Sequence, residues 1–247
     1  MPKVTAKKKE IIDFFDFEPG RIIARKYEII SRIGFGWEGE VYKICEVNTG
    51  IVRAAKIFYP QSNINNETSD IYAKKLHRLN ECPFVIKYQT QETITCKKIP
   101  VMVLISDYVD GELLTDYINR LPGKRLPQFQ GIHLLHALIT GIENIHYYGE
   151  YHGDLHAGNI LVRRLGLSFQ LKLIDLFHVG RTTRKNKNDD ICDAIRIFYD
   201  AIGGRKHYHK HPGEIKAICC GLKRSLILKK FRDASALRIY LENQAWS

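Results

Sequence analysis

Residues 151–162 read Tyr-His-Gly-Asp-Leu-His-Ala-Gly-Asn-Ile-Leu-Val and are the stretch that decides the fold. They place a carboxylate, Asp154, and an amide, Asn159, five residues apart on one tight loop. A carboxylate and an amide on one loop carry little information alone. The pattern becomes specific because residues 159–162 read as a buried strand, and a second apolar run, residues 171–175, follows and ends in Asp175.

A glycine-rich segment lies upstream. Residues 33–42 contain Gly-x-Gly-x-x-Gly-x-Val, in which glycines let the backbone approach phosphate groups without a Cβ in the way. The same glycines occur in dinucleotide-binding folds, where a helix should follow. Here residues 40–47 alternate apolar and polar, residues 48–50 supply a turn, and residues 51–58 make another strand that carries Lys56. This order predicts a glycine hairpin followed by a strand, and it disfavours the dinucleotide fold.

In this order the segments resemble the protein kinase-like superfamily, and residues 17–106 are most similar to bacterial eukaryotic-like (Hanks-type) Ser/Thr kinases. The resemblance covers about residues 17–205. It implies an α+β, bilobal fold with an antiparallel β-sheet N-lobe, one regulatory helix and a reduced, mainly α-helical C-lobe. We expect an N-terminal extension at 1–16 and one kinase-like domain at 17–247, with the N-lobe at about 17–106, a hinge at 107–111 and the C-lobe at 112–247.

The resemblance also implies a role for each site residue. Asp154 would accept the proton of the attacking hydroxyl, Asn159 and Asp175 would hold Mg²⁺, and Lys56 would grip the α- and β-phosphates of ATP. Ala54 would lie under the adenine, which would face the main chain of two hinge residues. The further nucleotide-binding positions implied are Ile33, Gly34, Gly36, Gly39, Val41, Asp107, Val109 and Leu161.

Four features depart from the family pattern. One is Asp175-Leu176-Phe177 in place of Asp-Phe-Gly, which removes a permissive glycine, so we expect the inactive flip of this segment to be disfavoured. The segment between Asp175 and the next helix, which we expect to open at Asp189, is less than half as long as a usual activation loop. Similar short segments and His-Gly-Asp loops occur in RIO-type kinases and in choline and aminoglycoside kinases. Gly153 replaces the arginine that normally receives a phosphorylated loop, so we expect a site that is always formed.

The acidic partner of Lys56 is the fourth departure. Counting back from Pro83 places Ala73 where a helix glutamate is usual. Glu67 is narrowly favoured over Asp70 because its side chain is longer, and both remain open. Ser69 is the expected cap of this helix.

Composition bounds the remaining alternatives. The net charge is +11, and basic residues concentrate in the C-terminal half, where Arg181, Arg184, Lys185 and Lys187 form one cluster. A solvated face is the simplest explanation, and attraction to an acidic protein substrate is the functional one. Nucleic-acid binding is disfavoured because no recognition motif accompanies the charge. With no membrane span, no secretory signal and no Cys-x-x-Cys pair among six cysteines, we expect a cytoplasmic protein.

Three functions therefore compete. The leading one is an ATP- and Mg²⁺-dependent Ser/Thr protein kinase of minimal, atypical form. The second is a small-molecule or lipid kinase of the same fold, which the short segment after Asp175 would also permit. The third is a nucleotide-binding pseudokinase scaffold, which retention of Lys56, Asp154, Asn159 and Asp175 disfavours because a scaffold needs none of them.

Overall fold

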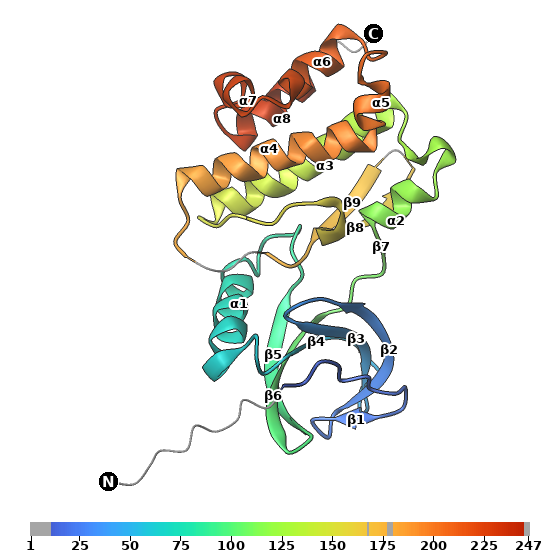
Figure 1. Ribbon diagram of the computed structural model, residues 1–247, viewed down its shortest axis with the longest axis vertical. Coiled ribbons are helices and arrows are strands. Elements are labelled where there is room, and N and C mark those ends of the chain that lie inside the picture. Colours follow the sequence, from blue (N-terminus) through green and yellow to red (C-terminus); the bar gives the residue numbers. More distant parts are fainter. Residues whose placement is uncertain (1–10, 167, 177–179, 245–247) are drawn as a thin grey trace. The chain divides into compact units, whose positions relative to one another are not determined.

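The computed structural model describes residues 11–166, 168–176 and 180–244, which divide into two compact units (Figure 1). Unit 1 contains the described residues up to His77 together with Lys87–Tyr108, and unit 2 contains Arg78–Ile86 and the described residues from Val109 onward. Among the helices of the described residues, none combines the length and apolar character that crossing a membrane requires.

Unit 1 is built on one antiparallel six-stranded sheet with the strand order β1-β2-β3-β4-β6-β5. Its strands are β1 (Ile22–Ile23), β2 (Tyr27–Phe35), β3 (Gly39–Glu46), β4 (Val52–Phe58), β5 (Tyr88–Cys96) and β6 (Ile99–Asp107). A short 3-10 turn, η1 (Ile64–Asn66), leads into the helix α1 (Glu67–Arg78). The predicted hairpin and the following strand are confirmed, because alternation of apolar and polar residues places one face of each strand in the core.

The segment that precedes the sheet packs into the same core. Ile12, Phe15 and Phe17 are buried, and the Phe15 ring stacks on Tyr59 at 5.2 Å between centroids. The main-chain N–H of Phe15 donates to the buried Glu40 carboxylate at 2.7 Å. The expected domain boundary at residue 17 therefore falls inside a segment that packs as one piece.

Glu40 is the polar centre of this core. Burial by itself would raise the pKa of this carboxyl, but hydrogen bonds from the Tyr42 hydroxyl, the Phe15 amide and the Tyr59 hydroxyl hold the pKa below its ordinary value. The Tyr59 hydroxyl has its pKa raised to about 12 by burial and by the bond to Glu40. A buried charge with this many donors is satisfied, and it fixes the N-terminal segment to the sheet.

Unit 2 is mainly helical. Its helices are α2 (Leu114–Asn119), α3 (Gln128–Tyr147), α4 (Arg184–Ala201), α5 (Gly204–Tyr208), α6 (Gly213–Cys219), α7 (Arg224–Lys230) and α8 (Ala234–Asn243), and its 3-10 turns are η2 (Pro122–Lys124), η3 (Ala157–Asn159) and η4 (Cys220–Leu222). A three-stranded antiparallel sheet, β7-β8-β9, consists of β7 (Glu112–Leu113), β8 (Ile160–Leu165) and β9 (Ser168–Leu173).

The core of unit 2 forms around α3, which lies beside α4 (Figure 1). Leu134, Leu138, Ile142 and Ile145 are among its buried residues and recur at helical spacing. This spacing predicts a helix over residues 130–148, and α3 confirms it. Gly131 lies where α3 meets α4, since a Cβ there would come within 2.3 Å of the Ile202 side chain.

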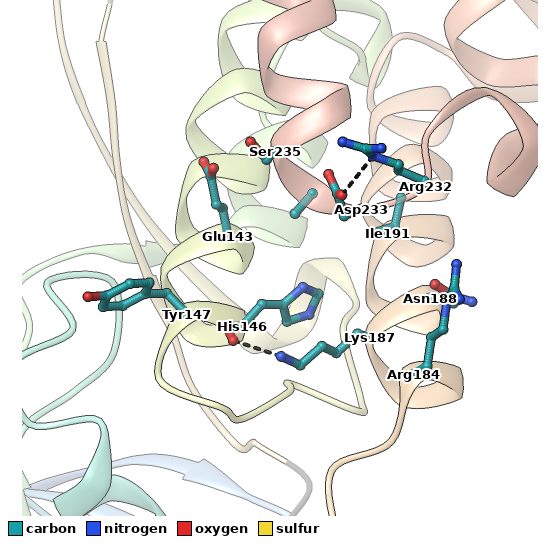
Figure 2. A pocket seen from close by; sticks show the side chains of 11 residues that line it. Glu143, His146, Tyr147, Arg184, Lys187, Asn188, Ile191, Arg232, Asp233 and Ser235 are labelled. Carbon is teal, nitrogen blue, oxygen red and sulfur yellow. Dashed lines mark hydrogen bonds and ion pairs between the residues drawn. The ribbon is translucent and has the colours of Figure 1, made fainter.

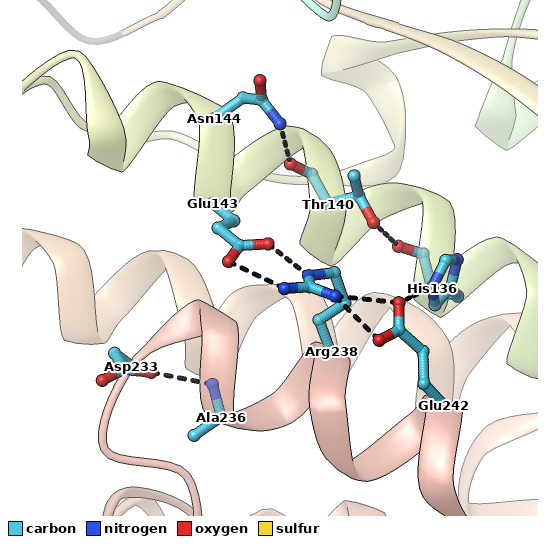
Figure 3. A network of polar contacts seen from close by, with 8 residues as sticks. All are labelled: His136, Thr140, Glu143, Asn144, Asp233, Ala236, Arg238 and Glu242. Carbon is cyan, nitrogen blue, oxygen red and sulfur yellow. Dashed lines mark hydrogen bonds and ion pairs between the residues drawn. The ribbon is translucent and has the colours of Figure 1, made fainter.

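The C-terminal helix is attached to α3 by a charged network (Figure 3). Arg238 on α8 donates to Glu143 of α3 and to Glu242 one turn further along α8, at 2.7 Å to the second carboxylate. Asp233 caps α8 by accepting the N–H of Ala236. The arrangement holds the last described helix on the same core that supports the catalytic-loop candidate.

Two expected boundaries were wrong. Helix α4 begins at Arg184 rather than at Asp189, because Thr183 and Asn186 form a capping box in which each side chain bonds the other residue's main-chain N–H. Ser69 does not cap α1 but lies inside its first turn, where its N–H donates to the Asn63 side chain at 3.0 Å.

Candidate functional site

The glycine hairpin joins β2 to β3 in unit 1. The Gly36 N–H donates to the Gly39 carbonyl at 2.9 Å, and Gly39 pairs with Phe58 at the end of β4. A Cβ on Gly39 would lie 2.0 Å from the carbonyl oxygen of Ile57, whereas a Cβ on Gly36 would meet nothing within 4 Å. Gly39 is therefore required by the packing of the hairpin on β4, and Gly36 leaves open space for whatever the hairpin binds.

Lys56 lies on β4 opposite Val41 of β3, which places it beneath this hairpin. Its ammonium group contacts the Glu38 carboxylate at 2.6 Å, and the Tyr72 ring of α1 lies 5.0 Å from the same nitrogen. The side chains of Lys56 and Glu38 are only 13% and 16% exposed. A charged pair this shielded from water is stronger than a surface pair.

The expected partners of Lys56 on α1 are not the ones that the structure provides. The Glu67 side chain is exposed, and Asp70 accepts a hydrogen bond from Gln91 at 3.4 Å. Ala73, at the position where a glutamate is usual, is buried. Both predictions assumed that the acid comes from the helix, whereas Glu38 comes from the glycine hairpin.

The remaining nucleotide-binding candidates of unit 1 lie on paired strands. Ala54 of β4 is directly opposite Ser106 of β6, and Ser106 is buried. Asp107 is the last residue of β6, and its carboxylate pairs with Arg53 at 2.6 Å. Because the side chain is engaged in this way, the main-chain carbonyl is the group of Asp107 that could contact a nucleotide. Ile33 is about half exposed at the end of β2, and Gly34 pairs with Val41 beside it.

The catalytic-loop candidate lies in unit 2, where Asn159 holds Asp154. The Asn159 side-chain amide donates to the Asp154 main-chain carbonyl at 2.9 Å and to its carboxylate at 3.2 Å. The Asp154 side chain is 61% exposed, so its carboxylate is open to a substrate. Nδ1 of His156 accepts the Gly158 N–H at 3.1 Å, which shows that this histidine fixes the loop backbone.

Asp175 reaches the same loop through the small sheet. β8 pairs with β9, and the Ile174 N–H donates to the Asn159 carbonyl at 3.0 Å. Asp175 follows with φ of +52°, a left-handed conformation that turns the chain just after the strand. The sequence predicted an aspartate at a strand end, and β9 in fact ends two residues earlier, at Leu173. The two remaining nucleotide-binding candidates belong to unit 2. Val109 follows β6, and Leu161 of β8 pairs with Leu113 of β7.

Asp190 of α4 supports the backbone of the catalytic-loop candidate. This fully buried carboxylate accepts the main-chain N–H of His152 at 2.7 Å and of Gly153 at 2.8 Å, and it bonds Nε2 of His146 at 2.9 Å. Gly153 has φ of +82°, a conformation that favours glycine and that an arginine would strain. Three partners on one carboxylate fix the path of the chain into Asp154.

Asp193, one turn further along α4, has its pKa raised to about 6. Burial is the main cause, the carboxylates of Asp190 and Asp189 add to it, and Arg196 and Arg224 oppose it. Asp193 also lines a hollow beside His156 and α2. The charge of this carboxyl therefore changes within the pH range of ordinary assays.

A larger hollow of about 460 Å³ lies among α3, the start of α4 and the start of α8 (Figure 2). Three cations line it: Arg184, Lys187 and Arg232. Arg232 pairs with Asp233, and Lys187 donates to the His146 carbonyl at 2.7 Å. Neither Arg184 nor Lys187 has an acidic partner among the residues that the structure describes. Arg181 and Lys185 are exposed nearby in the sequence, and residues 177–179 before them lie outside the described part.

Residues that the sequence did not single out also belong to these arrangements. Glu38 contacts Lys56, Tyr72 supplies an aromatic face, and His146 supports Asp190. The only sequence signal for Glu38 was its place between the second and third glycines. No spacing rule links His146 to a carboxylate 44 positions away, so this contact required the tertiary structure.

Comparisons with known proteins agree with these arrangements. The family profile described as the protein kinase domain matches residues 27–201. The chain is 30% identical to the cell division control protein 2 homolog C of Antirrhinum majus over 192 residues, which is 74% of this chain and 62% of that protein. It is 28% identical to mouse myosin-IIIb over 188 residues and 27% identical to cyclin-dependent kinase C-2 C of Arabidopsis thaliana over 182 residues. The matches cover 74% and 72% of this chain but only 14% and 27% of those proteins.

Among solved structures, the kinase domain of Mycobacterium tuberculosis PknI aligns with a TM-score of 0.65 and 16% identity, covering 93% of this chain and 100% of that chain. A double mutant of the same PknI domain aligns with the same TM-score at 17% identity, covering 93% of this chain and 99% of that chain. The α+β kinase fold expected from the sequence is thereby confirmed.

Proposed function

Because this chain belongs to the protein kinase family, we propose that it is an ATP- and Mg²⁺-dependent Ser/Thr protein kinase of minimal form, which transfers the γ-phosphate of ATP to a protein hydroxyl. The observation that carries the proposal is the loop at residues 152–159. There Asn159 holds Asp154 in place while Asp190 fixes the backbone that leads into it. A protein that only bound nucleotide would not require an exposed carboxylate held in this way.

Each site residue receives one role. Asp154 orients the attacking hydroxyl and accepts its proton, and Lys56 positions the phosphates by charge. The hairpin glycines, with Ile33, Val41, Ala54 and Leu161, bind the nucleotide, whose adenine is bonded by the main chain of Asp107 and Val109. When bound, Mg²⁺ neutralises charge on the phosphates.

The residues present fit Mg²⁺. Asp175 offers carboxylate oxygens, and the nitrogen of the Asn159 amide is used by Asp154, so its amide oxygen is the atom left for a cation. No described group donates to that oxygen. Two protein ligands are enough for Mg²⁺, because this ion takes few protein ligands and relies on phosphate and water for the others.

The minimal form is supported by the position of α4. Eight residues, 176–183, separate Asp175 from the first residue of α4, and Thr183 is already the helix cap. Too little chain remains there to build a ledge for a substrate peptide. Since Gly153 also replaces the arginine that would receive a loop phosphate, we expect activity as purified. A large loss of activity on phosphatase treatment, restored by incubation with ATP, would contradict this expectation.

An acidic protein substrate is the partner that the basic cluster at residues 181–187 favours. Arg184 and Lys187 line the hollow shown in Figure 2 without an acidic partner among the described residues, so an acidic segment would supply one. If so, raising the salt concentration should weaken substrate affinity more than ATP affinity. Charge reversal at Arg181, Arg184, Lys185 and Lys187 should do the same.

The deciding experiment measures transfer from γ-labelled ATP with Mg²⁺, with mixed acidic proteins as acceptors and with buffer alone. The parent should label protein, and Asp154→Ala should bind ATP normally while turnover falls about 10²–10⁴-fold. Lys56→Met should lose activity through both binding and turnover. Full turnover in Asp154→Ala would refute the proposed role.

Two other functions remain outcomes of the same experiment. Label that appears in a small molecule or lipid but not in protein would favour the second candidate, which the short segment after Asp175 also fits. Normal ATP binding without transfer to any acceptor would identify a pseudokinase. For location we propose the cytoplasm, supported by six free cysteines, three of which are buried.

A further inference from the structure

Helix α1 presents an aromatic ring rather than a carboxylate to Lys56. Tyr72 is buried, with its ring 5.0 Å from the lysine nitrogen, and the next residue is the buried Ala73. Neither acid of α1 serves as the partner of the lysine, since the Glu67 side chain is exposed and Asp70 accepts a hydrogen bond from Gln91. The ion pair that would link α1 to the catalytic lysine is therefore missing from the helix side.

The glycine hairpin supplies the carboxylate instead, and its backbone is anchored. The Tyr59 N–H donates to the Glu38 carbonyl at 2.8 Å, and the Ser62 hydroxyl donates to the Trp37 carbonyl at 2.8 Å. Both donors lie just after β4, the strand that carries Lys56. Glu38 and Lys56 are thus held on neighbouring pieces of backbone, and their side chains meet at 2.6 Å in a largely shielded position.

We propose that Glu38 is the positioning residue for Lys56, taking the place of the acid that α1 lacks. The inference rests on the proposed function, in which Lys56 positions the phosphates of ATP. A lysine ammonium group has three donors on a long single-bonded stem, so a bond to Glu38 restrains the stem and is compatible with others to phosphate oxygens. Phe58 and Tyr72 flank the group at 5.4 and 5.0 Å and limit its remaining freedom.

This arrangement changes what controls the lysine. In it, the position of Lys56 depends on the glycine hairpin, which also approaches the phosphates, and not on an ion pair to α1. A displacement of α1 would then leave the lysine paired. In the opposite role, the Glu38 carboxylate would compete with phosphate for Lys56. The two roles predict opposite changes in nucleotide affinity.

The first experiment measures affinity for a fluorescent ATP analogue with Mg²⁺, and KM for ATP and kcat in phosphotransfer. Glu38→Gln should weaken nucleotide affinity about tenfold, the loss expected for one charge-assisted contact, and should raise KM for ATP more than it lowers kcat. Glu38→Asp should recover most of the loss because it keeps the charge. Glu28→Gln, the same chemical change at an exposed position on β2, should match the parent. Tighter nucleotide binding by Glu38→Gln would overturn the positioning role and would show that the Glu38 carboxylate competes with phosphate for Lys56.

A double-mutant cycle separates the pair from general structural damage. Adding Glu38→Gln to Lys56→Met should have no further effect on nucleotide affinity, because the group that Glu38 positions has gone. An equal loss in both backgrounds would show that Glu38 acts independently of Lys56 and would refute the inference.

A third measurement does not depend on nucleotide chemistry. The rate at which an acylating reagent modifies the Lys56 amine, followed by mass spectrometry without nucleotide, should rise several-fold in Glu38→Gln because the carboxylate stabilises the unreactive ammonium form. A rise in this rate in a protein that neither binds nor uses ATP would keep the pairing and refute the proposed function. An unchanged rate would refute the pairing itself.

Discussion

Asp190→Asn should weaken both the fold of unit 2 and catalysis. In the parent, one carboxylate oxygen accepts the Gly153 N–H, while the other accepts the His152 N–H and bonds His146. The amide of asparagine turns one of these acceptors into a donor, so one or two of the three bonds are lost whichever way it faces. Hydrogen bonds to a charged group contribute about 1.5–3 kcal/mol each, and a buried N–H left without an acceptor costs about 1–3 kcal/mol.

The expected loss in the free energy of unfolding is therefore about 2–4 kcal/mol, a large part of the roughly 5–15 kcal/mol that holds a typical domain folded. Turnover should fall further than stability explains, because the loop that carries Asp154 loses its support. A displacement of about 1 Å in a catalytic group can lower turnover about 10²-fold.

The assay is urea unfolding followed by far-ultraviolet circular dichroism, which reports mainly on unit 2 because most of the described helices lie there. Turnover is measured separately at a temperature where both proteins are folded. Asp116→Asn, the same chemical change at an exposed position on α2 of the same unit, serves as the matched control and should change neither quantity. An Asp190→Asn protein within about 0.5 kcal/mol of the parent and within twofold in turnover would refute the bracing role, because surface substitutions alone vary by that much.

Three further results are expected. Gly39→Ala should lower the free energy of unfolding by about 1–3 kcal/mol or more, because the new Cβ would clash with backbone atoms, whereas Gly36→Ala should alter nucleotide affinity alone. Equal thermal unfolding temperatures for the two variants would contradict this difference. Asp193 has a pKa raised to about 6, which means that its protonated form favours the folded state. Its contribution to the free energy of unfolding is therefore full below about pH 4 and is lost as the pH rises through 6. Asp193→Asn should therefore raise the urea midpoint relative to the parent at pH 7.5 and not at pH 4, and a pH-independent difference would show that the carboxyl is not responsible. Arg238→Met should lower the free energy of unfolding by about 1 kcal/mol, and by less in high salt, because the ion pairs of Arg238 are partly exposed. A loss that salt does not change would mean that packing rather than charge holds α8 on α3.

Sequence patterns were sufficient for the elements whose signal is local. The alternation in residues 40–47 gave β3, the helical spacing of apolar residues gave α3, and the five-residue spacing of Asp154 and Asn159 placed both on one loop. Such features depend on side chains a few positions apart, where the geometry of a strand, helix or tight loop fixes which groups can meet.

Boundaries that depend on a cap were harder to predict. The run at residues 184–189 is polar and reads as loop, yet it forms the first turns of α4. The Thr183 hydroxyl accepts the Asn186 N–H, and the Asn186 side chain accepts the Thr183 N–H. The capping pair uses asparagine where glutamate or glutamine is usual, so the signal was weak.

What the sequence by itself determined is the family, the order of the elements and the candidates for the residues that carry the chemistry, since these follow from local pattern. What only the tertiary structure decided is which distant side chains meet. Glu38 rather than Glu67 or Asp70 contacts Lys56, because the register of β3 against β4 brings the hairpin over the lysine. His146 of α3 reaches Asp190 of α4 because these two helices pack side by side. Charge and reach allow many such partners along a chain, and packing selects one of them.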